Sequence, residues 1–342
     1  MMRIVRDISE TEWKQFLDSC SEATLYHTPE WKKFLEKTFG YKPYYLFATD
    51  ECGQMTGLLP LFNIKSRLTG NRLCSVPFSH KCGCLGEDDV CVSLLDEALL
   101  FQTAHGIEQI EIRDTADHHQ FQESNTFCTH ILELSQNPED TWKRLDKGSV
   151  RWAVKKSDKR GVSVLSSTNH EDIKAFYDLN CMTKQNLGVP CHPWEFFNNL
   201  FSLLGGYVRL YIAQYGGETI AGGVMEFYKD QVLYGYGAAN PEYLKIHPYN
   251  AFIWKSIEDA CAEGYCSYDF GRTSYSNTGL MQFKKKWGTQ EYTLCYSFSP
   301  YSRKSGLNDR ESRSYQFGNA VIRAMPKPVY MKFSKTVFSH FG

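Results

Sequence analysis

The sequence predicts an α/β protein built from two copies of one mixed helix-and-strand unit, because the same order of elements occurs twice. Each half opens a helix with a similar short segment, HTPEW at 27–31 and HPWEF at 192–196. Several strand patterns joined by tight turns follow in each half. A helix ending in AHG (104–106) or AEG (262–264) then leads into one further strand. Two tandem domains are therefore expected, each with a mixed, mostly antiparallel sheet flanked by helices.

Length and composition are those of an ordinary globular protein large enough for two domains. The chain has 342 residues, of which 42% are hydrophobic and 23% charged, and its formal charge is −1. This near-neutral charge argues against a surface that coats nucleic acid, but it leaves room for a local basic cleft. The sequence shows no secretory signal and no run of about 18 apolar residues. We expect a cytoplasmic monomer.

Cysteine and histidine spacing gives no indication of a metal site. The twelve cysteines are scattered, no C-x-x-C pair occurs, and the ten histidines show no H-E-x-x-H pattern. Reduced cysteines that pack as small hydrophobic residues are expected in a cytoplasmic protein of this size. We expect no bound metal.

The first domain is expected over residues 1–136. Its second helix has clear limits, because Thr28 can act as the N-cap, Pro29 suits the first helical position and Gly40 suits the stop. Helices are predicted over 10–20, 29–39 and 93–106, and strands over 43–50, 55–66, 72–78 and 107–114.

The second domain is expected over residues 137–300. Helices are predicted over 141–160, after Asn169, over 192–206 and over 248–264, and strands over 207–215, 218–228, 231–239 and 265–271. Residues 301–342 form a basic tail with eight Lys and Arg against two acids. One interpretation of this tail is a helix that contacts a membrane surface. The interpretation that we favour is a C-terminal helical segment that packs on the first domain.

Three segments resemble the FemAB-like family of peptidoglycan-bridge aminoacyltransferases and their relatives. They are LPLFNIKSRLTGNRLCSVPFSHKCGCLG (59–86), SVRWAVKKSDKRGVSV (149–164) and FGRTSYSNTGLMQFKKKWG (270–288). The resemblance implies two tandem GNAT acyltransferase folds. It also implies transfer of an acyl or aminoacyl group to an amine of a peptidoglycan or exopolysaccharide precursor. Members that use aminoacyl-tRNA often carry a coiled-coil insertion in the second domain, and this sequence has no such heptad segment.

The segment 268–288 holds the residues that we expect to be catalytic. Lys284 stands where the family's motif FK..WG has its site lysine, and a fixed cation there can stabilise the oxyanion of acyl transfer. Asp269, at the end of a core strand, can orient or deprotonate the amine, or it can cap the following loop and pair with Arg272. Lys285 and Lys286 are expected to be solvated.

The basic segment 143–160 and a tyrosine-rich strand supply the expected substrate-binding residues. Arg151 and Lys155 share one face of a predicted helix, and the family has a basic helix here, so we expect them to hold phosphates. The alternative is a solvated basic face. Tyr236 can bond a reacting carbonyl or line a sugar site, or it can be a core residue. Arg272 is the fourth expected substrate-binding residue.

We expect an acyltransferase that works by direct attack of the amine, without a covalent intermediate and without a tightly bound cofactor. The co-substrate is aminoacyl-tRNA or acyl-CoA, and no Gly-rich pyrophosphate turn of the CoA-binding type was found. The expected acceptor is an amine-bearing envelope precursor, including lipid-linked forms that would draw the enzyme to the inner face of the cell membrane. Two alternatives are an acyl-CoA-dependent N-acetyltransferase acting on a small amine and a non-catalytic protein that binds envelope-assembly partners.

Overall fold

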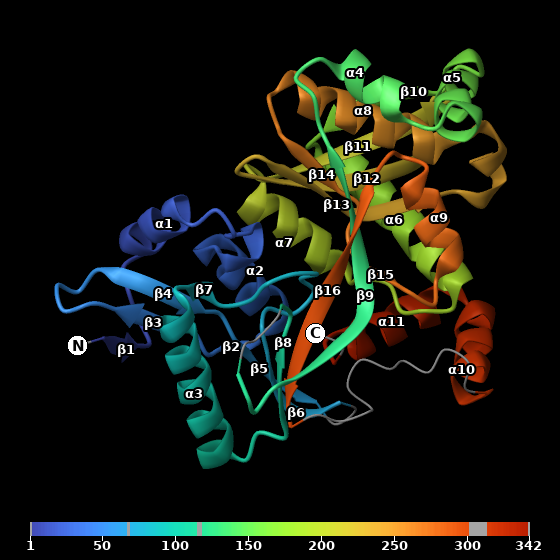
Figure 1. Cartoon of the computed structure of the whole chain (residues 1–342). Coiled ribbons are helices and arrows are strands. Elements are labelled where there is room, and N and C mark those ends of the chain that lie inside the picture. Colours follow the sequence, from blue (N-terminus) through green and yellow to red (C-terminus); the bar gives the residue numbers. More distant parts are fainter. Residues whose placement is uncertain (1, 67–68, 115–117, 301–312, 341–342) are drawn as a thin grey trace. The chain divides into compact units, whose positions relative to one another are not determined.

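The computed structural model describes residues 2–66, 69–114, 118–300 and 313–340, and it divides into two compact units (Figure 1). Unit 1 comprises Met1–Phe127, Thr293–Asn308 and Ser339–Gly342. Unit 2 comprises Cys128–Tyr292 and Asp309–Phe338. Strands β9 (Gln122–Glu133) and β16 (Gln290–Ser299) each begin in one unit and end in the other. The expected boundary after residue 136 therefore differs from this division.

Unit 1 contains helices α1 (Glu10–Ser19), α2 (Pro29–Phe39) and α3 (Asp88–His105). The predicted limits of α2 are present, since the Thr28 hydroxyl accepts a hydrogen bond from the backbone of Trp31 and Gly40 has a φ of 67°. A short helix, η1 (Leu25–His27), precedes α2. Local capping chemistry thus places this helix without help from the rest of the fold.

Two groups of hydrogen-bonded strands belong to unit 1. One has the order β1-β3-β4-β7, and the other runs β16-β8-β6-β5-β2, where β16 contributes its residues from Thr293 onward. The run 55–66 forms two strands in different sheets, because Pro60 separates them and proline cannot donate to a ladder. The strands are β1 (Arg3–Val5), β2 (Lys42–Pro43), β3 (Leu46–Thr49), β4 (Met55–Leu59), β5 (Phe62–Ser66), β6 (Gly70–Cys74), β7 (Leu85–Gly86) and β8 (Gln109–Ile112).

Unit 2 is built on a sheet of order β10-β11-β12-β13-β14-β9. Neighbouring strands are antiparallel except β13 and β14, which are parallel. A parallel pair needs a crossover connection, and helix α8 (Pro248–Ala262) supplies it. The strands are β10 (Ser163–Ser167), β11 (Val208–Tyr215), β12 (Glu218–Tyr228), β13 (Gln231–Ala239) and β14 (Ser267–Asp269), with the short β15 (Thr273–Ser274) paired to β9.

Helices cover both faces of the unit 2 sheet (Figure 1). A Cβ atom added at Gly222 would lie 3.2 Å from the ring of Phe176 on α6 (His170–Leu187). One added at Gly223 would lie 2.6 Å from the ring of Phe252 on α8. Since successive strand residues point to opposite faces, α6 and α8 lie on opposite sides of β12. Helix α7 (Trp194–Leu204) packs with α6 through the rings of Phe197 and Phe176.

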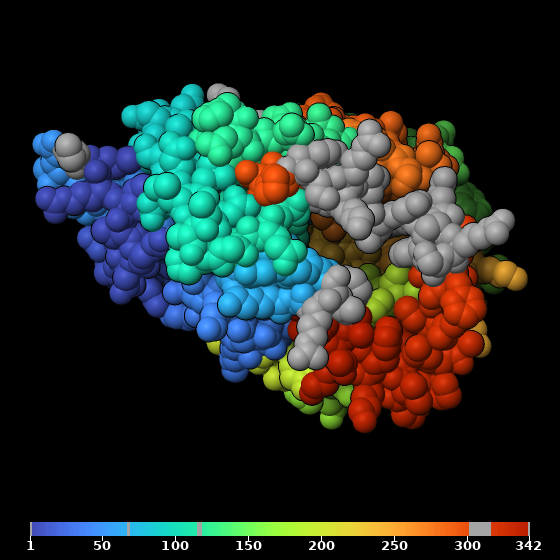
Figure 2. All heavy atoms as spheres, turned by 90° about the horizontal axis from the view of Figure 1, so that it is seen from below, coloured from blue at the N-terminus to red at the C-terminus, as the bar shows by residue number. Residues whose placement is uncertain are grey.

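Ser339 and His340 of the described basic tail belong to unit 1, where the Tyr41 hydroxyl donates a hydrogen bond to the carbonyl of Ser339 (2.7 Å), whereas residues 313–338 of the tail belong to unit 2. The part in unit 2 forms α10 (Arg313–Ala324) and α11 (Lys327–Phe338). Gln185 on α6 donates a hydrogen bond to the carbonyl of Met325 (2.7 Å), and the Tyr330 hydroxyl donates to that of Val189 (2.9 Å). Figure 2 shows α10 and α11 in red. The physical reason for the packing in unit 2 is the buried stripe Tyr330, Ser334 and Phe338, which recurs every fourth residue along α11.

Within the described residues, no helix has the length and apolar character needed to cross a membrane. The basic, aromatic α10 and α11 are included in this finding.

Candidate functional site

The carboxyl end of β14 carries a turn that Asp269 holds in place. The Asp269 side chain is 5% exposed, and its Oδ1 accepts hydrogen bonds from the backbone of Gly271 (2.7 Å) and from the Thr129 hydroxyl. Gly271 has a φ of 70°, a conformation that glycine adopts without strain. These are the contacts of a carboxylate that caps the following loop, which was one of the two interpretations of Asp269.

Lys284 is buried on the short helix α9 (Thr278–Lys285), which begins at the N-cap Asn277. Its side chain is 3% exposed, and its ammonium donates a 2.6 Å hydrogen bond to the carbonyl of Gly271. Burial lowers the pKa of Lys284 to about 8, while the negative charge of Asp269 acts in the opposite direction. The buried Trp287, next to Phe270, anchors the end of this helix. The sequence motif therefore places one cation in a desolvated setting.

Lys284 lies in the wall of a pocket of about 560 Å³ in unit 2. The wall combines α6, β13, the start of α8, the loop after β14 and α9. Three of its residues are cationic, and none of the described residues that line it carries a carboxylate. The lining residues are Thr183, Lys184, Leu187, Tyr234, Gly235, Gly237, Leu244, His247, Pro248, Tyr249, Asn250, Phe270, Arg272, Leu280, Phe283 and Lys284. This combination suits an anionic ligand with an apolar part.

Of the expected site residues, Lys284 and Arg272 line this pocket, and Asp269 lies behind it in the turn just described. The sequence interpretation missed Lys184 on α6, whose pKa is lowered by burial. It also assigned His247 to a turn. His247 lines the pocket, and among the described side chains its buried Nε2 has no hydrogen-bond partner. The sequence did contain one indication of this position, because a helix was predicted to begin at residue 248, directly after His247.

A bulge in β13 separates the two tyrosines of the strand. Val224 pairs with Tyr236 and Met225 pairs with Tyr234, so Gly235 is the extra residue. The extra residue turns the two rings to opposite faces. Tyr234 lines the pocket, whereas Tyr236 packs among the rings of His192, Phe196 and Phe197 at 5.0, 5.4 and 5.5 Å. Tyr236 is thus placed in an aromatic cluster and not beside Lys284.

The basic segment 141–160 is not one continuous helix. It consists of α4 (Pro138–Arg144), η2 (Lys147–Arg151) and α5 (Trp152–Lys159), and Asp146 caps the second piece. Lys155 is exposed, with its ammonium 6.0 Å from the ring centre of Trp142, and Arg151 is half-buried. Neither lines the 560 Å³ pocket. Trp152, the first residue of α5, is 50% exposed.

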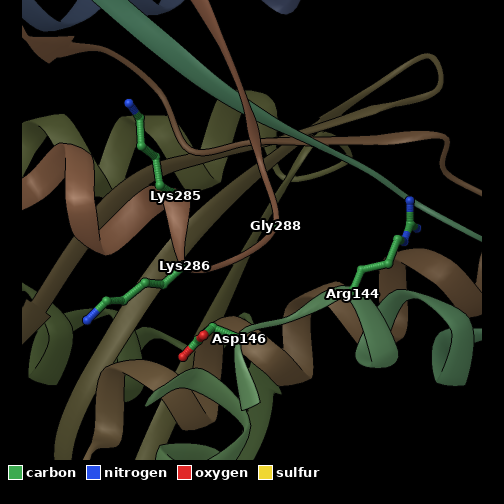
Figure 3. A pocket seen from close by; sticks show the side chains of 5 residues that line it. All are labelled: Arg144, Asp146, Lys285, Lys286 and Gly288. Atoms are coloured by element: carbon green, nitrogen blue, oxygen red, sulfur yellow. The ribbon is translucent and has the colours of Figure 1, made fainter. Parts of the chain in front are cut away.

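A smaller hollow of about 320 Å³ lies at the C-terminal end of α9 and is lined by Arg144, Asp146, Lys285, Lys286 and Gly288 (Figure 3). Lys285 points away from Lys286 and Asp146 in this view. The Lys285 ammonium instead pairs with Glu291 at 2.9 Å. That ion pair raises the pKa of Lys285. The expectation that Lys285 and Lys286 are solvated agrees with their exposure.

One group of described residues has the donor atoms of a metal site, namely Cys128, His130 and Glu291, within 4.8 Å of one another. His130 is completely buried, and burial together with the nearby Lys284 charge lowers its pKa. However, Glu291 is engaged by Lys285. A divalent cation would have to displace one lysine and approach another, which is electrostatically unfavourable.

Comparison with known proteins identifies the fold. Residues 147–285 match the family model described as an acetyltransferase (GNAT) domain. The solved structure of FemX has a TM-score of 0.69 at 17% identity, covering 86% of this chain and 96% of FemX. L-PGS from Bacillus licheniformis has a TM-score of 0.55 at 13% identity, covering 86% of this chain and 95% of that one.

A tandem GNAT protein from the clavulanic acid biosynthesis pathway has a TM-score of 0.56 at 11% identity, covering 88% of this chain and all of that one. The sequence has no match among proteins of curated function. The structural matches span both units, and the predicted FemAB-like tandem GNAT fold is confirmed.

Proposed function

From this tandem GNAT fold and the pocket at Lys284, we propose that the chain is an N-acyltransferase acting on an amine of a cell-envelope precursor. The observation that carries the proposal is the buried Lys284 ammonium in the wall of a cationic pocket. FemX shares the fold. The C-terminal domain of a protein described as a lysylphosphatidylglycerol synthetase, from Agrobacterium fabrum, also shares the fold, with a TM-score of 0.58 at 9% identity, covering 85% of this chain and 92% of that one. That name joins a lysyl group to phosphatidylglycerol, an envelope lipid, and so supports an envelope component as the acceptor.

In the proposed reaction, every bond that forms or breaks and the transferred proton can be accounted for. The unprotonated amine attacks the carbonyl carbon of the donor, so a C–N bond forms and the carbonyl oxygen becomes an oxyanion. Collapse of this intermediate breaks the C–O bond of an ester donor or the C–S bond of a thioester donor. The proton lost by the attacking nitrogen ends on the leaving oxygen or sulfur. No enzyme nucleophile is needed, and positioning with charge stabilisation can supply most of the rate.

Lys284 is the residue that we assign to the oxyanion. Its ammonium is fixed by the Gly271 carbonyl and shielded from water, so its field acts in a low-dielectric setting. Asp269 then acts as a positioning residue, because it holds the turn that presents Gly271 to Lys284. Lys184 and Arg272 would bind phosphates of a substrate. Arg151 and Lys155, outside the pocket, would contact a longer anionic substrate.

A second candidate is an acyl-CoA-dependent N-acetyltransferase that acts on a small amine. Two observations favour it: the match to a GNAT acetyltransferase domain and the first residues of α8 in the pocket wall. A helix N-terminus is a favourable place for a pyrophosphate.

The test is a transfer assay with the purified full chain. Radiolabelled aminoacyl-tRNA and acyl-CoA are each offered together with a nucleotide-linked or lipid-linked muropeptide or with a small amine. We expect an amide product from an envelope precursor and no acylated protein in acid-quenched samples. Product from acyl-CoA and a small amine alone would establish the second candidate. Precursor binding without turnover for every donor would favour the non-catalytic alternative.

A further inference from the structure

Trp152 is a large aromatic side chain with half its surface in water, in a unit whose other large rings are mostly covered. It begins α5, and its exposure of 50% contrasts with the completely buried Trp287 of the same unit. Leaving such an apolar surface in water forgoes stabilisation that burial would give. An exposed aromatic beside a binding pocket is therefore a candidate for ligand contact.

Two neighbours define the setting of the Trp152 ring. The Lys156 ammonium lies 4.4 Å from the centre of the ring, in cation–π geometry. The His247 ring meets it edge-on at 5.1 Å between ring centres. His247 lines the 560 Å³ pocket, so Trp152 stands one residue beyond the pocket wall. The Trp152 ring thus contacts the Lys156 ammonium and one residue of the pocket wall.

His247 both contacts the Trp152 ring and lines the pocket. It adopts a left-handed conformation with a φ of 58°, and its Nε2 is buried without a hydrogen-bond partner among the described atoms. A buried nitrogen without a partner costs free energy. His247 thus joins Trp152 to the pocket wall through ring packing.

The geometry points to Trp152 and Lys156 as a binding site for the adenosine phosphate end of the acyl donor. An aromatic face suits a purine ring, and an adjacent ammonium suits the phosphate attached to it. This inference rests on the proposed function, and it applies to both possible donors. Coenzyme A carries a phosphorylated adenosine, and every aminoacyl-tRNA ends in one.

The experiment measures binding of the full chain by calorimetry with two probes, coenzyme A and the trinucleotide CCA. Trp152→Ala should weaken binding of the donor-type probe by roughly 5- to 150-fold, because base stacking contributes about 1–3 kcal/mol. Trp152→Phe, which keeps a stacking face, should retain most of the affinity. Lys156→Ala should weaken binding and make it less sensitive to salt.

Matched controls exist for both changes. Phe317, on α10, is 72% exposed, so Phe317→Ala removes an exposed ring elsewhere in the same unit. Lys159 is an exposed lysine on the same helix as Lys156, so Lys159→Ala removes an equal charge. Neither control should alter the affinity for either probe. The probe that binds to wild type also identifies which donor is the source of the adenosine.

Outcomes for the site and for the catalytic proposal can be separated. If Trp152→Ala binds both probes as wild type does, or if wild type binds neither, the adenosine site is wrong, whatever the transfer assay shows. If transfer is absent but probe binding depends on Trp152, the site stands and the catalytic proposal fails. If Trp152→Ala instead lowers only the binding of vesicles containing anionic lipid, the ring is a membrane contact and the inference is overturned.

Discussion

Lys284 and Lys285 are consecutive residues on one helix, and they occupy opposite electrostatic environments. Lys284 is 3% exposed and donates to a backbone carbonyl, and burial lowers its pKa to about 8. The side chain of Lys285 is 47% exposed and pairs with Glu291, which raises its pKa. One residue of separation rotates a side chain by about 100° around a helix, enough to move it from a pocket to solvent. Residue type alone therefore does not indicate which lysine is buried at the pocket.

The largest expected contrast is in turnover. Lys284→Met removes the cation with little change in volume, and loss of one oxyanion-stabilising group typically lowers kcat by about 10²–10³-fold. Lys285→Met should keep kcat within about twofold, since its charge lies outside the pocket. Steady-state transfer assays on both variants measure this contrast. Equal losses in both would show that the helix, and not Lys284, is what matters.

The next contrast is in stability across alkaline pH. Lys284 has a pKa of about 8 when folded and an ordinary value of 10.5. Below pH 8 the buried cation therefore makes its full unfavourable contribution to the stability of the fold. This contribution is lost as the pH rises from 8 to 10.5, because Lys284 loses its proton first in the folded state. Wild type should gain about 3 kcal/mol relative to Lys284→Met over this window. Denaturant titrations at pH 7.5 and 10.5 measure it, with Lys285→Met as a control that should show no such gain.

A smaller effect concerns the pH profile of turnover. If the protonated Lys284 is needed, kcat should fall as the pH rises through about 8. Asp269 raises the pKa of Lys284, so Asp269→Asn should move this falling limb to lower pH. Profiles of wild type, Asp269→Asn and Lys285→Met test it. If the falling limb of the profile lies at the same pH in Asp269→Asn as in wild type, the group that titrates is not Lys284.

The smallest expected effect is that of the exposed ion pair. Lys285→Ala loses the contact with Glu291, and exposed pairs contribute about 0.2–1 kcal/mol, screened by salt. Thermal unfolding at low and high salt should show a small loss that vanishes at high salt. A loss of several kcal/mol would mean that Lys285 is as integral to the fold as its neighbour.

Where local chemistry decides structure, the sequence was sufficient. Thr28, Pro29 and Gly40 predict the limits of α2, and Asn169 predicts the start of α6, because caps act over one turn. The break in the basic segment had a local indication too. Asp146 and Gly148 are typical turn residues. They were overlooked because the spacing of the basic residues favoured one continuous helix over 141–160.

Features that depend on distant residues could not be predicted. Strand β9 was missed, since Thr129 and His130 look polar but are buried once β14 pairs beside them. Likewise, the bulge at Gly235 depends on pairing with β12. The sheet face to which Tyr236 points could therefore not be predicted from the alternation of residues along the strand. Lys184 joins Lys284 at one pocket only through the fold of α6, far away in sequence.

The order of the two units along the chain has a consequence for synthesis. The chain leaves unit 1 after Phe127 and returns at Thr293, and β16 then pairs with β8. At about 5–20 residues per second, a ribosome needs roughly 8–33 s to make residues 128–292 between them. Throughout that interval the nascent unit 1 has an unpaired strand edge at β8. The first segment of unit 2, Cys128–Tyr292, is made during this wait, so chaperone contacts in the cell should concentrate on β8 until translation passes residue 299.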